Sequence, residues 1–112
     1  GGGACFTEET CTARAKTSLG SSTKWPTSMN SAPTADLSDQ RSVNPDFAGA
    51  WKVYVPYCSG DVHSGTNNAS SAASWGLVFQ GHSNVAAVVD DLLDDATTGP
   101  ALRRANHVLL SG

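Results

Sequence analysis

The sequence predicts an α/β protein, because apolar residues recur first with strand spacing, then with helix spacing, and then in a strand-like run. Residues 51–57 alternate and are rich in aromatic and β-branched residues, which is typical of a strand. Residues 83–97 carry apolar side chains at helical spacing. Residues 107–112 (His-Val-Leu-Leu-Ser-Gly), with three apolar residues in a row, are of the buried-strand type. This order is that of a βαβ unit, in which a helix connects two parallel strands.

The composition excludes several classes of function. The chain has 112 residues, with 7 Lys plus Arg, 10 Asp plus Glu and a formal net charge of −3. It has no basic patch, so we expect no nucleic-acid partner. Its longest uncharged run, residues 62–89, is rich in Ser, Asn and Gly, so we expect no membrane segment. The three histidines stand at no ligand spacing, so neither a metal site nor a cofactor is expected.

The first element is a glycine loop, residues 1–4 (Gly-Gly-Gly-Ala), which leads into a helix start. Bare backbone of this kind presents N–H groups to an anion. In ester hydrolases of the α/β-hydrolase type, a glycine-rich loop donates part of the oxyanion hole, the group of N–H donors that stabilises the negatively charged oxygen of the transition state. A flexible tail or a cloning scar has the same composition, so both interpretations stay open.

A helix is predicted next, over residues 7–19. Thr7 is the N-cap candidate with Thr10 at the third helical position, and Gly20 is the C-cap candidate. Residues 21–45 are mainly Ser, Thr, Asn, Asp and Pro and predict a long loop. So long a loop is unusual in a small domain unless it packs on a larger body.

Three cysteines allow one pair and leave one cysteine over. Cys5 and Cys11 are six residues apart, and closing so short a loop would stabilise the fold by roughly 2–2.5 kcal/mol. Cys58 then has no partner, which in a secreted protein indicates an intermolecular bond, a free thiol or a partner outside this chain.

A polar loop, residues 58–65 (Cys-Ser-Gly-Asp-Val-His-Ser-Gly), follows the first predicted strand. Open α/β sheets place their sites at the carboxyl ends of strands, so this loop is a candidate site. Asn68 begins an Asn-Ala-Ser glycosylation sequon, a short pattern that is also common by chance. Residues 76–80 (Gly-Leu-Val-Phe-Gln) predict a second, short strand.

The predicted helix over residues 83–97 is amphipathic. Its apolar side consists of Val85, Val88, Val89, Leu92 and Ala96, and its acidic side of Asp90, Asp91, Asp94 and Asp95. Four aspartates suggest calcium, but a helix does not gather alternate carboxylates around one ion, so a solvated face is the preferred interpretation.

Ordered blocks along the whole chain resemble the pectin acetylesterase and Notum family. They are residues 1–6 (Gly-Gly-Gly-Ala-Cys-Phe), 11–14 (Cys-Thr-Ala-Arg), 17–22, 44–47 (Asn-Pro-Asp-Phe), 54–65, 79–81, 90–93 and 109–112. The resemblance implies a secreted serine carboxylesterase of α/β-hydrolase fold with a Ser, Asp and His triad.

The resemblance also implies roles for individual residues. Gly2 and Gly3 would supply oxyanion-hole N–H groups, and Ala4 and Asp61 would border the substrate pocket. Cys5 would pair with Cys11. Cys58 would pair with a cysteine upstream of the glycine loop.

The nucleophile motif of the family, Gly-x-Ser-Ala-Gly-Gly, would start at Gly112. We therefore expect residues 1–112 to be part of an α/β-hydrolase domain that is incomplete at both ends and that needs the rest of the same polypeptide to fold and to hydrolyse esters. The expected substrate is an acyl ester, first of all an acetylated polysaccharide. Ala4 stands where plant members have a tryptophan and Notum has bulky aromatic residues, so the pocket wall is smaller here, which argues against both a pectin-specific and a long-acyl specificity. The alternative is a non-catalytic binding or structural component that keeps the hydrolase fold.

Overall fold

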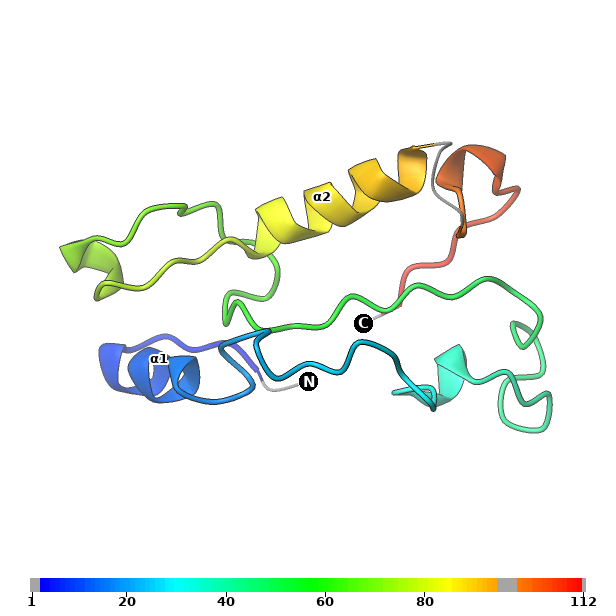
Figure 1. The fold of residues 1–112 in the computed structure, drawn as a ribbon, viewed down its shortest axis with the longest axis horizontal. Helices are drawn as coiled ribbons and strands as arrows, with labels where there is room; N and C mark the ends of the chain where they lie inside the picture. The colour runs from blue at the N-terminus through cyan, green and yellow to red at the C-terminus, as the bar shows by residue number, and fades with distance from the viewer. Residues whose placement is uncertain (1–2, 95–98, 112) are drawn as a thin grey trace.

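The computed structural model describes residues 3–94 and 99–111, and in this part the chain forms helices and loops (Figure 1). The α-helices are α1 (Glu8–Ala15) and α2 (Gly81–Leu93), and the short 3-10 helices are η1 (Ala35–Leu37), η2 (Ala72–Ser74) and η3 (Leu102–Arg104). Helix α1 lies at one end of the elongated molecule, and α2 extends along one long side toward η3, which it contacts.

Helix α1 begins where the sequence predicts and ends earlier. Thr7 and Thr10 form a reciprocal capping box: the Thr10 amide donates to Thr7 Oγ1 at 3.3 Å, and the Thr7 amide donates to Thr10 Oγ1 at 3.2 Å. The helix ends at Ala15 instead of residue 19, because the Thr17 amide and hydroxyl both donate to the Arg14 carbonyl and tighten the last turn.

Helix α2 confirms the predicted amphipathic pattern except at Val89, which was placed on the apolar side and is exposed, and it starts two residues earlier than the predicted residue 83. Val85, Val88 and Leu92 are half-buried, whereas Asp90 and Asp91 are exposed. The helix ends at Leu93 with Asp94 as its C-cap, so the predicted extension to residue 94 is wrong, and residues 95–98 lie outside the described part. Among the described residues, no helix is both long and apolar enough to cross a lipid bilayer.

The strand predictions are wrong for the described residues. Segments 51–57, 76–80 and 107–111 contain no strand, and Gly112, which ended the third prediction, is not described. The one pairing is an isolated antiparallel bridge between Asn67 and Phe79. A strand exists only when a neighbouring backbone accepts and donates its hydrogen bonds, and side-chain alternation does not supply that neighbour. The predicted βαβ unit is therefore not formed here.

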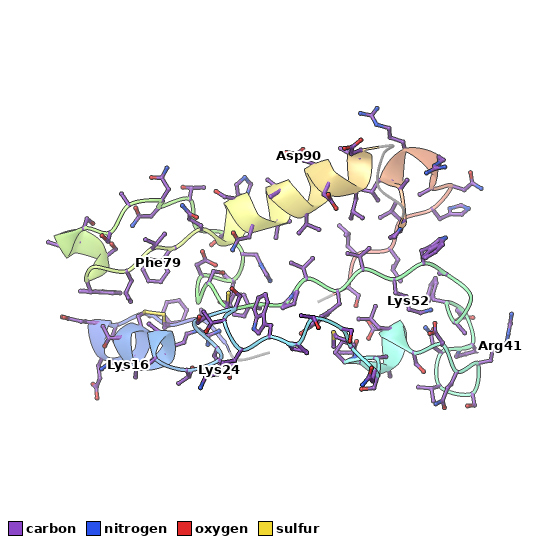
Figure 2. All side chains as sticks on the ribbon, viewed as in Figure 1. Lys16, Lys24, Arg41, Lys52, Phe79 and Asp90 are labelled. Carbon is purple, nitrogen blue, oxygen red and sulfur yellow. A yellow bond between two sulfur atoms is a disulfide. The ribbon has the colours of Figure 1, made fainter. Side chains whose placement is uncertain are left out.

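Little apolar surface is buried in the described part of the chain. The buried apolar residues there are Cys11 and Ala48, while Phe6, Trp51 and Leu110 are 84%, 79% and 91% exposed. The radius of gyration is 16.2 Å, compared with about 13 Å for a compact domain of this length. Figure 2 shows this loosely packed arrangement, in which side chains such as Arg41 and Asp90 project from separate segments.

The predicted long loop over residues 21–45 is confirmed. Its backbone is held in place by the buried side-chain amide of Asn44. Asn44 is 5% exposed. Its Nδ2 donates to the carbonyls of Asp36 and Ser38 at 2.7 and 3.0 Å, and its Oδ1 accepts from the Phe47 amide at 3.1 Å. The Asp36 carboxylate in turn accepts a hydrogen bond from Ser111 Oγ, which connects this loop to the C-terminal segment.

Candidate functional site

The glycine loop is attached to the polar loop, and two of its described backbone amides make no internal hydrogen bond. The Cys5 amide donates to the Gly60 carbonyl at 3.0 Å, and Arg14 Nη1 donates to the Gly3 carbonyl at 2.8 Å. Within residues 3–94 and 99–111, the amides of Gly3 and Ala4 donate to no acceptor. Gly2 is not described, so the oxyanion-hole role of Gly2 and Gly3 stays a prediction.

A disulfide joins the glycine loop to α1. Cys5 and Cys11 are bonded, with their Cα atoms 5.1 Å apart, and Cys11 is 2% exposed. Cys58 is a half-buried free cysteine in the part of the chain that the structure describes. Its pairing with a cysteine upstream of the glycine loop stays a prediction.

The polar loop folds around the carboxylate of Asp61, which accepts hydrogen bonds on both oxygens. Its donors are Ser59 Oγ at 2.5 Å and the amides of Gly81, His63 and Gly65 at 2.8, 3.0 and 3.1 Å. Gly81 is the first residue of α2, and a carboxylate at a helix N-terminus also interacts favourably with the helix dipole. Asp61 therefore holds the polar loop against the start of α2.

These hydrogen bonds decide the acidity of Asp61. Burial alone would raise the pKa of its carboxyl group, because burial disfavours the charged form. The Ser59 hydroxyl and the amides of Gly81, His63 and Gly65 favour the carboxylate, and together they lower its pKa below the ordinary value. The group is therefore an anion at neutral pH.

Two glycines allow this close approach to the carboxylate. A Cβ atom at Gly65 would lie 2.1 Å from Asp61 Oδ2, and a Cβ atom at Gly81 would lie 2.1 Å from Asp61 Oδ1. Neither position has room for a side chain unless the carboxylate moves. Asp61 was expected at the substrate pocket, and these contacts could not be predicted, because two glycines 16 residues apart follow no recognisable spacing.

The turn after Asp61 is held in an uncommon backbone conformation. Val62 and His63 have φ angles of 50° and 61°, in the left-handed region that non-glycine residues rarely adopt. The Ser64 amide closes the turn by donating to the Asp61 carbonyl at 3.0 Å, and the Val62 amide donates to Tyr57 Oη at 2.7 Å. The rings of Tyr57 and His63 lie 4.8 Å apart, so this turn is fixed from several sides.

The hydrogen bonds to Asp61 indicate a structural role for its carboxylate. Both of its oxygens are already occupied by protein donors, so the carboxylate is not free to accept a proton from a substrate without losing one of them. Its placement at the border of the substrate pocket stays a prediction, as does that of the half-buried Ala4.

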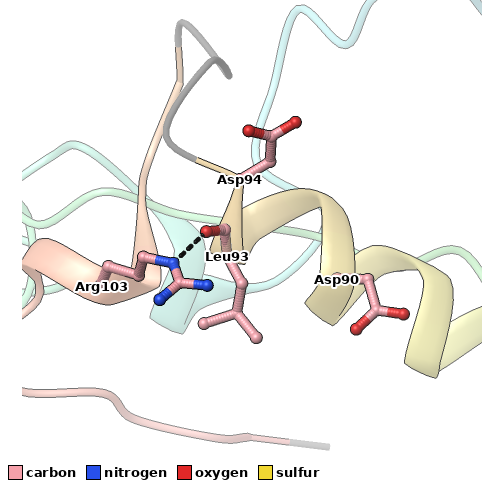
Figure 3. A pocket seen from close by; sticks show the side chains of 4 residues that line it. All are labelled: Asp90, Leu93, Asp94 and Arg103. Atoms are coloured by element: carbon pink, nitrogen blue, oxygen red, sulfur yellow. Dashed lines mark hydrogen bonds between the residues drawn. The ribbon is translucent and has the colours of Figure 1, made fainter.

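The remaining features concern Asn68 and the C-terminal end of α2. Asn68 is exposed, and its glycosylation stays a prediction. Asp90, Leu93, Asp94 and Arg103 line a cavity of about 470 Å³ at the C-terminal end of α2 (Figure 3). Arg103 Nε donates to the Leu93 carbonyl at 2.6 Å and so caps the helix end. No group of three or more potential metal ligands occurs among the described residues.

Comparison with known proteins identifies the family. The profile of the pectinacetylesterase family matches residues 1–112. The chain is 37% identical to palmitoleoyl-protein carboxylesterase NOTUM of Homo sapiens and 36% identical to palmitoleoyl-protein carboxylesterase notum1a of Danio rerio, over 100% of this chain and 21% of each relative. It is 39% identical to pectin acetylesterase 4 of Arabidopsis thaliana, over 100% of this chain and 26% of the relative.

The chain therefore spans about a fifth to a quarter of the length of these curated relatives. The predicted resemblance is confirmed along the whole sequence, including the glycine loop, both helices and the polar loop. Because the family profile matches over residues 1–112, the chain belongs to the pectinacetylesterase family.

Proposed function

We propose that the chain is the oxyanion-loop part of a secreted carboxylic-ester hydrolase of α/β-hydrolase fold, whose nucleophilic serine and its partners lie in other segments of the same protein. Membership of a family whose matched members are named carboxylesterases and pectin acetylesterases carries this proposal. The unoccupied amides of Gly3 and Ala4 support it, because an oxyanion hole needs N–H groups without internal acceptors.

In the proposed reaction a serine oxygen attacks the acyl carbonyl carbon, and the carbonyl oxygen takes up the negative charge. Backbone N–H groups of Gly2 and Gly3 donate hydrogen bonds to this oxygen, so the charge is stabilised without side-chain rearrangement. The alcohol then leaves, and water releases the acyl group from the serine. Losing one such donor typically costs roughly 3–4 kcal/mol of transition-state stabilisation.

Ala4 indicates a small acyl group. A methyl side chain next to the N–H donors leaves a low pocket wall, and pocket contacts decide which substrate is turned over. An acetyl ester of a polysaccharide is therefore our leading substrate. The Cys5–Cys11 disulfide supports an extracellular location, because disulfides persist in oxidising compartments.

The test uses the intact protein with acetylated pectin and with chromogenic acetyl, butyryl and octanoyl esters. We expect the highest kcat/KM for the acetyl esters. Gly3→Pro removes an N–H donor and should lower kcat by about 100- to 1,000-fold. Gly3→Ala is the matched control, because it keeps the donor and its Cβ would have no atom within 4 Å.

Two outcomes contradict the proposal. Unchanged turnover in Gly3→Pro would remove the oxyanion role of this residue. Absence of turnover with every ester, in a protein that is folded, would favour a non-catalytic binding or structural component instead.

A further inference from the structure

Arg14, in the last turn of α1, connects the glycine loop with the polar loop. Its Nη1 donates to the Gly3 carbonyl at 2.8 Å, and its guanidinium carbon lies 5.0 Å from the centre of the Tyr57 ring. A hydrogen bond from a charged donor is stronger than one between neutral groups. The Gly3 carbonyl is therefore held by a charge-assisted hydrogen bond.

The guanidinium group is confined on its other sides. Its Nε and Nη2 atoms are covered from solvent and donate to no acceptor among the described residues. The face of the Tyr57 ring compensates in part, because it attracts a cation. The absence of a side chain at Gly60 leaves room for the Arg14 side chain, since a Cβ atom there would come within 3.3 Å of Arg14 Cδ and Nε. Among the described residues, the Gly3 carbonyl is thus the one hydrogen-bond acceptor of this side chain.

This single bond determines the direction of a neighbouring donor. The Gly3 carbonyl and the Ala4 N–H belong to one peptide group, and the described residues contain no cis peptide bond. In a planar trans peptide these two groups point in opposite directions. When Arg14 holds the carbonyl, the Ala4 N–H must point away from the guanidinium group. The next amide, that of Cys5, is held by the Gly60 carbonyl, so the peptide is fixed on both sides.

We propose that Arg14 is a positioning residue for ester hydrolysis: by holding the Gly3 carbonyl, and with it the peptide group between Gly3 and Ala4, it fixes the end of the glycine loop and so the place from which the Gly2 and Gly3 N–H groups donate to the oxyanion. This inference rests on the proposed function. A run of glycines has wide conformational freedom, and an oxyanion hole acts best when its donors are ordered before the reaction. Arg14 itself touches no reacting atom and acts through the backbone.

The experiment compares Arg14→Met with Arg41→Met in the intact protein. Arg41 is exposed and makes no hydrogen bond or ion pair within the described residues, so it is a matched control. Two quantities are measured: amide hydrogen exchange in residues 1–10, and kcat and KM for a chromogenic acetyl ester, with active serine counted by a fluorophosphonate.

For Arg14→Met we expect faster exchange in residues 1–10 and a loss of about 100-fold in kcat per active serine, with KM little changed. Arg14→Lys should retain part of the activity, because an ammonium group also donates to a carbonyl but cannot stack on Tyr57 in the same way. If Arg14→Met does not fold, Arg14→Lys is assessed by the same measurements. Arg41→Met should change neither quantity.

Unchanged exchange in both Arg14 variants would overturn the inference whatever the activity. Faster exchange with an unchanged kcat would overturn it as well, because the loop would then not depend on Arg14 for catalysis. A wild-type protein that hydrolyses no ester would refute the proposed function, and the exchange result would still report separately whether Arg14 orders the loop.

Discussion

The carboxylate of Asp61 accepts a hydrogen bond from the backbone amide of Gly81 at 2.8 Å, although 20 residues separate them in the chain. This bond joins the polar loop to the first residue of α2. The same loop accepts a hydrogen bond from the Cys5 amide through the Gly60 carbonyl. The glycine loop, the polar loop and α2 are therefore one hydrogen-bonded unit with Asp61 near its centre.

Asp61→Asn should destabilise the intact protein by about 1–3 kcal/mol, because the new NH₂ group would face donors and leave them without an acceptor. The free energy of unfolding in urea measures the loss. Asp46→Asn is the matched control, because Asp46 is exposed and makes no hydrogen bond in the described residues. Equal stability of the two variants would contradict the supporting role of Asp61.

The stability contributed by Asp61 should also depend on pH. Its pKa is lower in the folded protein than in the unfolded chain, so the unfolded chain binds the proton more tightly. The contribution is therefore complete above the ordinary value of about 3.9 and is lost as the pH falls through the lower folded-state pKa. Urea unfolding from pH 6 to pH 2.5 should show a steeper acid loss in wild type than in Asp61→Asn, and parallel curves would contradict this.

Gly81→Ala should destabilise the protein by roughly 1–3 kcal/mol, since its Cβ would lie 2.1 Å from Asp61 Oδ1 and 2.6 Å from His63 Cα. Alanine is the better helix former by about 1 kcal/mol in a helix interior, and at this first helical position a clash with backbone outweighs any such gain. Gly49→Ala is the control, because a Cβ atom there would have no neighbour within 4 Å. Thermal unfolding measures the stability of both variants. A gain in stability for Gly81→Ala would contradict the observed packing.

Mass mapping of a non-reduced digest should recover a peptide that contains the Cys5–Cys11 bond and no peptide that joins Cys58 to either cysteine. Reducing this short-loop disulfide should remove roughly 2–2.5 kcal/mol of stability in the chain-entropy model. Free thiols at Cys5 and Cys11 in native material would contradict both the pairing and the oxidising compartment.

Asn68 should carry an N-glycan if the source is eukaryotic, because it is exposed in a polar segment and begins a sequon. Mass spectrometry of the peptide before and after glycosidase treatment tests this, with Asn68→Gln as the control. Unmodified Asn68 in every peptide from a eukaryotic secreted source would remove the prediction without affecting the fold.

Features set by residues close together in the chain could be predicted from the sequence, whereas contacts between distant residues could not. The Thr7 and Thr10 capping box and the start of α1 follow from residues that are neighbours in the chain. The apolar spacing of α2 follows in the same way. Asp61 contacts Gly81, and Arg14 contacts Gly3, through backbone atoms of the glycines. Every residue has these atoms, so no side-chain pattern predicts such contacts.

The strands were mispredicted for a different reason. Alternation in residues 51–57 shows which side chains would be buried on one face of a sheet, but a strand also needs neighbouring backbone. Within the described residues that neighbour is absent, and Trp51 stays 79% exposed. We therefore keep the α/β-hydrolase sheet as part of the proposed function, where other segments of the protein would complete it.

Residues 1–112 expressed alone should neither unfold cooperatively nor hydrolyse esters. The physical reason is burial: Cys11 and Ala48 are the buried apolar residues of the described part, whereas Phe6, Trp51 and Leu110 are largely exposed. Folding stability comes mainly from apolar burial, which must exceed the entropy lost on ordering the chain, and here there is little of it.

Catalysis should fail independently of folding, because the sequence has no Gly-x-Ser-x-Gly motif to present a nucleophile above the glycine loop. Circular dichroism during heating and turnover of a chromogenic acetyl ester test the two parts separately, with serine-to-alanine variants as controls for background hydrolysis. A sharp two-state transition of the monomer, or turnover that one of these serine variants abolishes, would show that these residues form a self-sufficient domain.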